Sequence, residues 1–508
     1  MATLVALGLG LLAFVTSLKL MRAEDVGARL VATARTAGAT MAAPDLGDAE
    51  KEAAMRAAAG RLFLGFFRIG GIGLAALGLS GLIVWAGAAL GLYTMAEALA
   101  LASDGVFLLA SGAIATALWV ALPKAGRGRR PEGERAARPD DIPYGRADRA
   151  LHRLAFAGPG LQKALAQVET DRYADRIDLA TARRPVFVTS LARAGTTILL
   201  EVLARQGEFA AATYRHMPFA LAPLMWSELT RGFRKPADAV ERAHGDGLTV
   251  GFDSPEAFEE MAWLAFWKDQ YARDHIRPWP QEAANPAFER FFELYRAKVV
   301  ATRPGAERYL AKNNASIARL GYLQRICPDA TLLIPVRDPM AHVRSLMRQH
   351  ARFGRLHAQE PFGRRYMEGI GHFEFGQALR PILFDGAPPA GDEAAHPDFW
   401  LRYWADVHEG VLATAGAGAV FLDHDALSAD PRRHLPVLAR ALGLQDRAAL
   451  AATAPRFRAP RPAAPPEDAD RALLARVREV HAALIARCLI RAPAPVVPLR
   501  RPRARAEA

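Results

Sequence analysis

The sequence predicts an α/β fold, a P-loop-like parallel sheet flanked by helices, preceded by an N-terminal transmembrane helical region. Between residues 150 and 490, short apolar runs rich in β-branched residues alternate with helical patterns, which is typical of parallel strands joined by crossover helices. Three long apolar blocks come before this region, each long enough to span a bilayer as a helix. The chain has 508 residues, 51% hydrophobic and 23% charged, so more than one domain is expected and a wholly disordered chain is excluded.

The N-terminal region, residues 1–123, is predicted to hold three transmembrane helices. The apolar blocks are residues 2–18, 63–92 and 106–122, and only the second carries a basic residue, Arg68 near its start. A cleaved signal peptide is the alternative for the first block, but no basic residue precedes it and two further spans follow.

Basic residues predict the orientation of these spans. One group lies between the first two blocks and another follows the third: Lys19, Arg22, Arg29, Arg35, Lys51, Arg56 and Arg61, then Lys124, Arg127, Arg129 and Arg130. The positive-inside rule places both groups in the cytoplasm and the N-terminus outside. We therefore expect a multi-pass protein of the cell inner membrane with a cytoplasmic catalytic domain.

Much of the net charge of +12 lies outside the predicted catalytic region. Residues 124–149 have the composition of a basic linker, and residues 491–508 that of a disordered basic tail. Attraction to anionic lipid explains the linker better than nucleic-acid binding, because no aromatic residues are interleaved with the basic ones. We expect a membrane partner and no nucleic acid, and the sequence does not indicate an oligomeric state.

The α/β domain, residues 150–490, contains three clear strand-to-helix units. The strands are predicted at 185–189, 330–336 and 419–423, and the helices that follow them at 196–205, 340–348 and 431–442. Two cysteines, Cys327 and Cys488, lie far apart and lack zinc-site spacing, so a disulfide scaffold is excluded and a reducing compartment is favoured.

Residues 186–200 (VFVTSLARAGTTILL) run from a buried strand into a helix. Such a turn aims backbone N–H groups and the positive end of the helix dipole at one point, as an anion site requires. Gly195 lets the backbone approach closely, Arg193 supplies a charged fork, and Thr196 and Thr197 supply hydroxyl groups. The Walker A lysine is missing, so a magnesium-nucleotide site is not expected. The alternative is a plain turn whose threonines cap the helix.

A second anion-binding element is predicted in residues 331–346 (TLLIPVRDPMAHVRSL). Arg337 ends the strand and Ser345 lies on the following helix, so the two side chains can converge on one phosphate. Ligands of open α/β sheets bind at the carboxyl ends of the strands. Two anion sites on this edge predict a ligand with two separated phosphates.

Together these features resemble the sulfotransferase family that uses 3′-phosphoadenosine 5′-phosphosulfate (PAPS), in its bacterial and Golgi-like branch. The matches to its 5′-phosphosulfate loop are Arg193, Ala194, Gly195, Thr196 and Thr197, and those to its 3′-phosphate motif are Arg337 and Ser345. Lys312 in YLAKNN resembles the family's substrate-strand lysine, and residues 420–444 resemble its C-terminal element. The resemblance covers about residues 183–445 and implies that PAPS is the co-substrate, with Arg193 and Lys312 stabilising charge on the transferred group.

The general base is less clear, because Asn314 stands where the cytosolic branch of the family has its histidine. By resemblance to membrane-associated branches, the base lies in the segment 209–219 (FAAATYRHMPF), where His216 is the first candidate and a histidine without a catalytic role is the alternative. Glu256 and Glu259 are further candidates. For these two, a capped helix with Pro255 in its first turn is the simpler interpretation.

The expected function is transfer of the sulfuryl group of PAPS to a hydroxyl or amine of a carbohydrate, lipid or small metabolite. The leaving phosphate of PAPS is already a good leaving group, so positioning and charge stabilisation suffice and no metal is expected. The alternatives are a P-loop-like kinase or nucleotide hydrolase, and a non-catalytic membrane receptor for an anionic nucleotide.

Overall fold

The computed structural model describes residues 2–42, 48–105, 107, 108, 111, 112, 114, 115, 119, 146–156, 158–230, 240, 241, 249, 250, 254–386 and 393–491. The chain divides into two compact units, Met1–Ala157 and Gly158–Ala508. Most of the predicted third span (106–122), most of the predicted linker (124–149) and nearly all of the predicted tail (491–508) lie outside the described residues.

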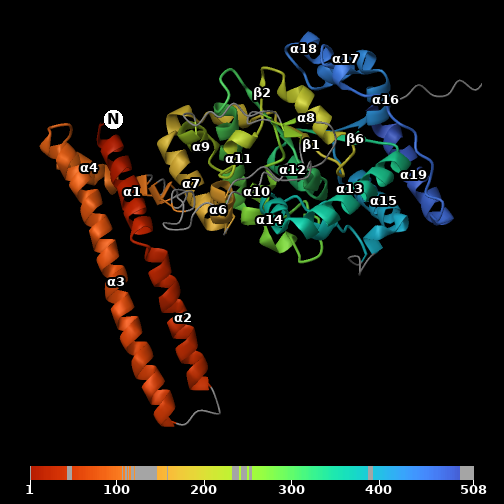
Figure 1. Ribbon diagram of the computed structural model, residues 1–508. Helices are drawn as coiled ribbons and strands as arrows, with labels where there is room; N and C mark the ends of the chain where they lie inside the picture. Colours follow the sequence, from red (N-terminus) through yellow and green to blue (C-terminus); the bar gives the residue numbers. More distant parts are fainter. Residues whose placement is uncertain are drawn as a thin grey trace, which may run out of the picture. The chain divides into compact units, whose positions relative to one another are not determined.

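The first unit is helical. Its described helices are α1 (Ala2–Leu20), α2 (Ala23–Ala42), α3 (Asp48–Ala89), α4 (Met95–Ala102) and α6 (Arg146–Ala155). Helices α1 and α2 follow one another along the length of α3 (Figure 1).

Two segments of this unit, Ala2–Leu20 and Met55–Ala89, are long and apolar enough to cross a membrane. They coincide with the first two apolar blocks of the sequence. Large apolar side chains on α3 are exposed, among them Leu64 and Leu74, each 73% exposed.

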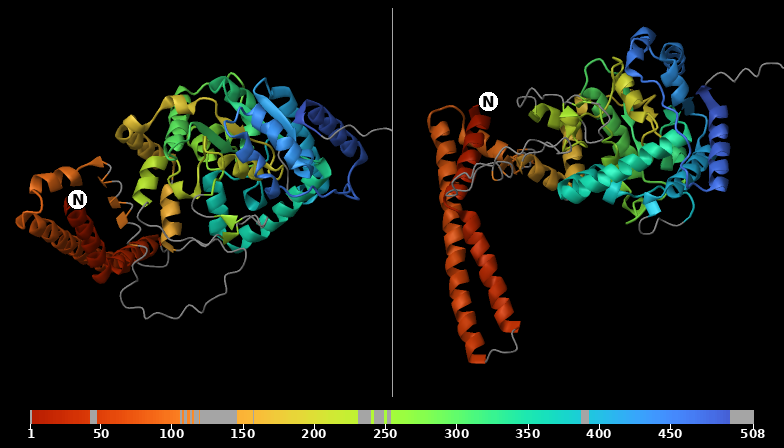
Figure 2. Two further views of the ribbon diagram at one scale, coloured as in Figure 1. Left: turned by 90° about the horizontal axis from the view of Figure 1, so that it is seen from above. Right: turned by 45° about the vertical axis from the view of Figure 1, so that its right-hand side comes forward.

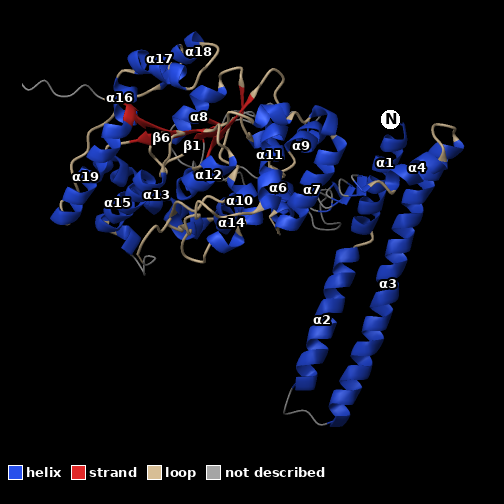
Figure 3. Ribbon diagram, turned by 180° about the vertical axis from the view of Figure 1, so that it is seen from behind, coloured by secondary structure: helices blue, strands red, loops and turns tan. Residues whose placement is uncertain are grey.

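The second unit is built on a sheet that lies among helices (Figure 3). The sheet has six strands in the order β2-β5-β1-β6-β7-β8, and every neighbouring pair is parallel. The strands are β1 (Val186–Val188), β2 (Phe209–Ala210), β5 (Arg308–Lys312), β6 (Thr331–Val336), β7 (Ala419–Asp423) and β8 (Cys488–Ile490). A separate antiparallel pair joins β3 (Val240–Glu241) to β4 (Thr249–Val250). Because β5 and β6 flank β1 on opposite sides, the strand order reverses at β1, which is where open α/β sheets bind their ligands.

Helices cover both faces of the sheet, with α8, α17 and α18 on one side and α13 and α15 on the other (Figures 1 and 2). The helices of this unit are α7 (Pro159–Arg172), α8 (Thr196–Ala204), α9 (Pro223–Thr230), α10 (Glu260–Phe266), α11 (Pro286–Ala301), α12 (Leu320–Ile326), α13 (Pro339–Gln359), α14 (Pro361–Ile370), α15 (Pro397–Thr414), α16 (His424–Ala429), α17 (Pro431–Ala441), α18 (Arg447–Ala451) and α19 (Arg471–Arg487).

Strand β1 shows why the sheet is buried on both faces. Val186 and Val188 belong to the apolar core formed with α8, α16 and α17. Phe187, between them, packs against the rings of Phe292 and Tyr309 instead. Successive side chains of a strand point to opposite faces, so a continuous apolar run is what a central parallel strand requires.

The predicted α/β class is confirmed, and the three predicted strands coincide with β1, β6 and β7. The expected helix with Pro255 in its first turn is wrong, because α10 begins at Glu260. Pro255 instead forms an isolated β-bridge with Thr213, and the Glu256 N–H donates to the Ala212 carbonyl. These bonds hold residues 255 and 256 extended against the chain that follows β2.

Candidate active site

The phosphate loop, residues 189–195, joins the carboxyl end of β1 to α8. Arg193 has φ +73° and Gly195 has φ +97°, so both residues adopt the left-handed backbone conformation. Position 195 requires glycine, because a Cβ on any other residue there would lie 2.3 Å from Cε1 of His424. Gly195 is the N-cap of α8 and no side chain caps this helix end. The first N–H groups of a helix without such a cap are suited to hold an anion.

The second anchor, Arg337 and Ser345, meets the phosphate loop directly. Arg337 Nη1 donates to the Arg193 carbonyl at 2.8 Å, and Arg193 Nε donates to Ser345 Oγ at 3.4 Å. Burial lowers the pKa of Arg337, Arg193 acts in the same direction and Asp425 opposes both. Two arginines that meet in this way at one sheet edge favour an anion near them.

His342 contacts the backbone of the phosphate loop. Its Nε2 lies 2.8 Å from the Ala192 carbonyl, and its Nδ1 accepts a hydrogen bond from Trp404 Nε1 at 3.1 Å. With Nδ1 accepting, Nε2 must carry the proton and donate it to the loop. Burial lowers the pKa of His342 well below its ordinary value, so the ring is neutral. Sequence reasoning missed this role because His342 has no spacing that marks it.

His424 lies next to Gly195 of the loop. It is the first residue of α16, after β7. Burial lowers the pKa of His424 to about 4, and the charge of Arg337 acts in the same direction. Two neutral imidazole rings therefore lie against the loop, His342 at Ala192 and His424 at Gly195.

Asn314 links the start of α8 to a carboxylate that sequence reasoning also missed. Thr196 Oγ1 donates to Asn314 Oδ1 at 3.2 Å, and Asn314 Nδ2 donates to Glu374 Oε1 at 2.7 Å. Thr196 lies in the first turn of α8, at the candidate anion site, and Asn314 follows β5. The spacing between Asn314 and Glu374 in the sequence carries no signal of this contact.

Lys312, at the carboxyl end of β5, pairs with Glu256. Lys312 Nζ lies 3.7 Å from Glu256 Oε1, and both side chains are buried. Glu256 also accepts from Tyr214 Oη at 3.1 Å and from the Ala257 N–H at 2.9 Å. The structure therefore gathers Lys312, the 209–219 segment and Glu256, three elements that the sequence singled out separately.

His216 lies in the short 3-10 helix Tyr214–His216 and is 2% exposed. Its Nδ1 accepts from the Thr213 N–H at 3.1 Å. In a neutral imidazole that accepts at Nδ1, Nε2 carries the proton. This arrangement gives His216 a part in closing the turn.

Glu259 and its neighbour Glu260 belong to a buried network. Glu259 accepts from Trp263 Nε1 at 3.1 Å, Tyr309 Oη at 2.9 Å and Asn313 Nδ2 at 3.3 Å. Burial raises the pKa of Glu259. Since donors occupy both of its oxygens, Glu259 is suited to holding α10 against the sheet.

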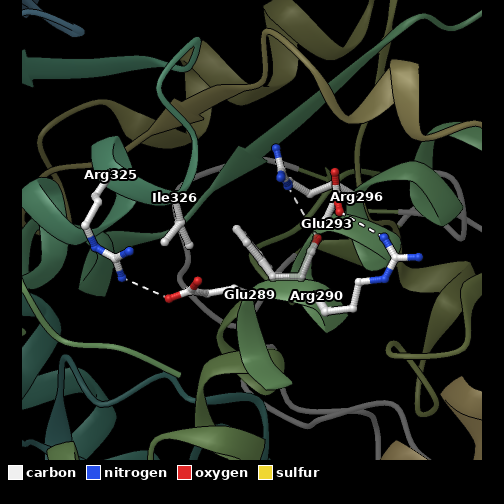
Figure 4. A pocket seen from close by; sticks show the side chains of 7 residues that line it. Glu289, Arg290, Glu293, Arg296, Arg325 and Ile326 are labelled. Atoms are coloured by element: carbon white, nitrogen blue, oxygen red, sulfur yellow. Dashed lines mark hydrogen bonds and ion pairs between the residues drawn. The ribbon is translucent and has the colours of Figure 1, made fainter. Parts of the chain in front are cut away.

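Two pockets differ in their relation to this site. The larger, about 440 Å³, is lined by α11 and α12 (Figure 4). Its ion pairs are internal, Arg325 with Glu289 at 2.9 Å and Arg290 with Glu293 at 3.1 Å. Its Arg296 donates to the Ala182 carbonyl, which precedes β1, so the pocket lies at the amino ends of the strands, away from the phosphate loop.

The smaller pocket adjoins the phosphate loop, because Leu191 and Ala192 form part of its wall. Asn314 and Glu374 line it as well. It thus adjoins both the candidate anion site and the carboxylate of Glu374, to which Asn314 donates.

Among the described residues, no three or more His, Cys, Asp or Glu side chains form a group that could hold a metal ion. Cys327 and Cys488 are buried free thiols. Burial raises the pKa of each thiol to about 12.

Comparison with known proteins gives a direct match for this region. Residues 185–374, which contain the phosphate loop, Lys312, Arg337 and Ser345, match the sulfotransferase family. The structure is similar to sulfotransferase STF9 from Mycobacterium avium, with a TM-score of 0.38, 17% identity, and 63% of this chain and 78% of that chain covered. It is also similar to sulfotransferase STF1 from Mycobacterium tuberculosis, with a TM-score of 0.36, 16% identity, and 73% and 92% covered. No curated protein matches this chain.

Proposed function

Because residues 185–374 are a sulfotransferase-family segment, we propose that this protein is a membrane-anchored sulfotransferase that takes PAPS as donor. The observation that carries the proposal is the contact between the two anion-binding elements, Arg337 Nη1 to the Arg193 carbonyl at 2.8 Å. A nucleotide with phosphates at both its 5′ and 3′ positions matches two cationic elements on one sheet edge. A nucleoside triphosphate carries its phosphates in one chain and has no separate phosphate for the second cationic element to bind.

In this proposal the phosphate loop holds the 5′-phosphosulfate and the second anchor holds the 3′-phosphate. The loop N–H groups, Arg193, Thr196 and Thr197 stabilise charge on the leaving phosphate. Arg337 and Ser345 fix the far end of the nucleotide, which orients the sulfur for in-line attack. Lys312, at the end of the neighbouring strand, stabilises the oxygens of the transferred group.

Membrane anchoring rests on the two apolar helical segments of the first unit, Ala2–Leu20 and Met55–Ala89. Of the 18-residue window that marks the second segment, only 11% is buried. Exposed apolar surface of this extent is stable in lipid and unfavourable in water. We propose that the catalytic unit lies on the cytoplasmic side of the membrane, where the positive-inside rule also places the basic segments.

Labelled transfer tests this function. Full-length protein in detergent is given PAPS labelled in the sulfuryl group and an extract of lipids and sugars, with and without EDTA. Label in an extract component, unchanged by EDTA, is the expected result. Binding of adenosine 3′,5′-bisphosphate (PAP) is followed by calorimetry in Arg193→Ala, with the exposed Arg344→Ala as control.

Each alternative has its own outcome. Dependence on ATP and magnesium would replace the proposal with a kinase or nucleotide hydrolase. PAP binding with no turnover of PAPS would indicate a receptor. Equal PAP affinity in Arg193→Ala and the unsubstituted protein would remove the donor site from the phosphate loop.

A further inference from the structure

We propose that Asn313 is a positioning residue: it anchors the turn after β5 to two buried carboxylates and so directs Lys312 toward the sulfuryl group of the donor. This inference rests on the proposed function, in which Lys312 stabilises the oxygens of the transferred group. Asn313 belongs to neither of the two anion-binding elements.

The turn after β5 decides where two polar side chains of the candidate site lie. The Asn313 N–H donates to the carbonyl of Val188, the last residue of β1, at 2.9 Å, so this turn lies beside the start of the phosphate loop. Before Asn313 comes Lys312, the last residue of β5, and after it comes Asn314, which accepts from Thr196. A change in the backbone at Asn313 therefore displaces both of its neighbours.

The side chain of Asn313 is 4% exposed and is hydrogen-bonded at both ends of its amide. Nδ2 donates to Glu260 Oε2 at 2.7 Å and to Glu259 Oε1 at 3.3 Å. Oδ1 accepts from the Ala315 N–H at 3.1 Å. The two N–H groups and the oxygen of the amide thus each have a partner. Turning this amide leaves buried polar groups unpaired, which costs free energy, so the orientation of Asn313 is fixed.

The carboxylate of Glu260 is itself held in place. It pairs with the guanidinium of Arg319, whose side chain is completely buried. The guanidinium carbon lies 3.8 Å from the ring centroid of Trp263 and 4.9 Å from that of Trp279. A buried ion pair packed against two aromatic rings has little freedom to move. The network therefore gives Asn313 a rigid support.

Asn313 is also the N-cap of the 3-10 helix Asn314–Arg319, and capping alone is the simpler role. A cap uses the side-chain oxygen, which here accepts from the Ala315 N–H. The two amide N–H groups take no part in the cap and go to the carboxylates. Serine caps a helix about as well as asparagine but has no amide N–H groups, so Asn313→Ser separates the two roles.

Two ligands together identify an effect that passes through Lys312. PAPS and PAP share the nucleotide with phosphates at its 5′ and 3′ positions, and only PAPS carries the sulfuryl group. A displaced Lys312 should therefore weaken PAPS binding and leave PAP binding unchanged. A residue needed only for folding affects the binding of both ligands or of neither.

The test is calorimetric titration of full-length protein in detergent with PAPS and with PAP, without an acceptor. Asn313→Ser should weaken PAPS binding by about 10-fold, a typical share of one hydrogen bond to a charged group, with PAP affinity within about twofold. Asn285→Ser is the matched control and should change neither affinity. Asn285 caps α11 by accepting from the Phe288 N–H at 3.0 Å, and its Nδ2 donates to the Phe266 carbonyl at 3.2 Å.

A second substitution shows whether Asn313 acts through Lys312. Lys312→Gln removes the charge and keeps a donor for Glu256, and it should weaken PAPS binding by about 10-fold or more with PAP affinity unchanged. In the double variant Asn313→Ser/Lys312→Gln, PAPS affinity should be no lower than in Lys312→Gln alone. Two residues that act as a unit give such non-additive losses.

The outcomes separate this inference from the proposed function. Unchanged PAPS affinity in Asn313→Ser would overturn the positioning role, and so would equal losses of PAPS and PAP affinity, up to loss of both. Losses that add in the double variant would show that Asn313 does not act through Lys312. Failure of the unsubstituted protein to bind either PAPS or PAP would instead overturn the proposed function itself.

Discussion

Gly195→Ala tests the geometry of the phosphate loop. Gly195 has φ +97°, and an added Cβ would lie 2.3 Å from Cε1 and 2.4 Å from Nδ1 of His424. Gly305 is a matched control, since it has φ +81° but an added Cβ would meet no atom within 4 Å. The two substitutions therefore share the backbone penalty and differ in the contact with His424.

The expected magnitudes follow from these distances. A left-handed conformation costs alanine about 1–2 kcal/mol, so Gly305→Ala should destabilise the protein by about that amount. Gly195→Ala adds overpacking against a buried ring, which costs about 1–3 kcal/mol more. At about 2–4 °C per kcal/mol, its melting temperature should lie a further few degrees below that of Gly305→Ala.

The assay combines thermal unfolding with calorimetric titration of PAP. Gly305→Ala should bind PAP like the unsubstituted protein. Gly195→Ala should bind it more weakly by about 100-fold, because displaced loop N–H groups lose hydrogen bonds to a charged ligand worth about 1.5–3 kcal/mol each. In the double variant Gly195→Ala/His424→Ala the steric contact is gone, so it should be no less stable than the sum of the single changes predicts.

Equal melting temperatures for Gly195→Ala and Gly305→Ala, together with unchanged PAP affinity, would refute the placement of His424 over the loop. A double variant less stable than that sum would show that the contact with His424 is not the source of the penalty.

Three other substitutions give clear expectations. Arg337→Lys removes the hydrogen bond to the Arg193 carbonyl and should weaken PAP binding by about 10-fold or more in calorimetry. Arg344→Lys, on the exposed face of α13, is the control and should leave PAP affinity unchanged. Equal PAP affinities in the two variants would count against the second anchor. Arg319→Leu leaves the buried carboxylate of Glu260 without its ion-pair partner and should destabilise the protein by about 3–5 kcal/mol. Arg290→Leu, in an exposed pair with Glu293, should change stability by about 1 kcal/mol or less. Similar melting temperatures for the two variants would contradict this difference. Burial lowers the pKa of His408 to about 4, so the unfolded chain binds a proton at this residue more readily than the folded protein does. The contribution of His408 to stability should be fully present above about pH 6.5 and should fall toward pH 4 by up to about 1.4 kcal/mol per pH unit. His408→Gln should reduce this slope in thermal melts at several pH values, and an unchanged slope would contradict a neutral, buried His408.

Local signals in the sequence were enough to predict the strands that carry the candidate site. The run 186–188 has apolar residues at every position, which only a strand buried on both faces tolerates, and a glycine follows it where the chain turns into a helix. Pro339 after the strand at 331–336 marks a first helical turn in the same way. Both signals reside in residues that are neighbours along the chain.

The sequence was misleading where a distant segment competes with a local preference. Ser254 and Pro255 have the composition of a helix start, yet residue 255 bridges to Thr213 and the helix begins at Glu260. The free energy of this pairing comes from a segment some 40 residues away, which a local pattern cannot include. Tertiary context therefore decides the start of α10.

By itself, the sequence determined the α/β class and the two apolar helical segments near the N-terminus, and it predicted the two anion-binding motifs, because each depends on residues close together in the chain. Only the tertiary structure brought Arg193 within reach of Ser345, put His342 beneath the loop and joined Asn314 to Glu374. These contacts join residues 60 to 152 positions apart. Hydrogen bonds of this kind depend on angstrom-scale separations set by the packing of the whole sheet and its helices, and no spacing along the chain encodes them.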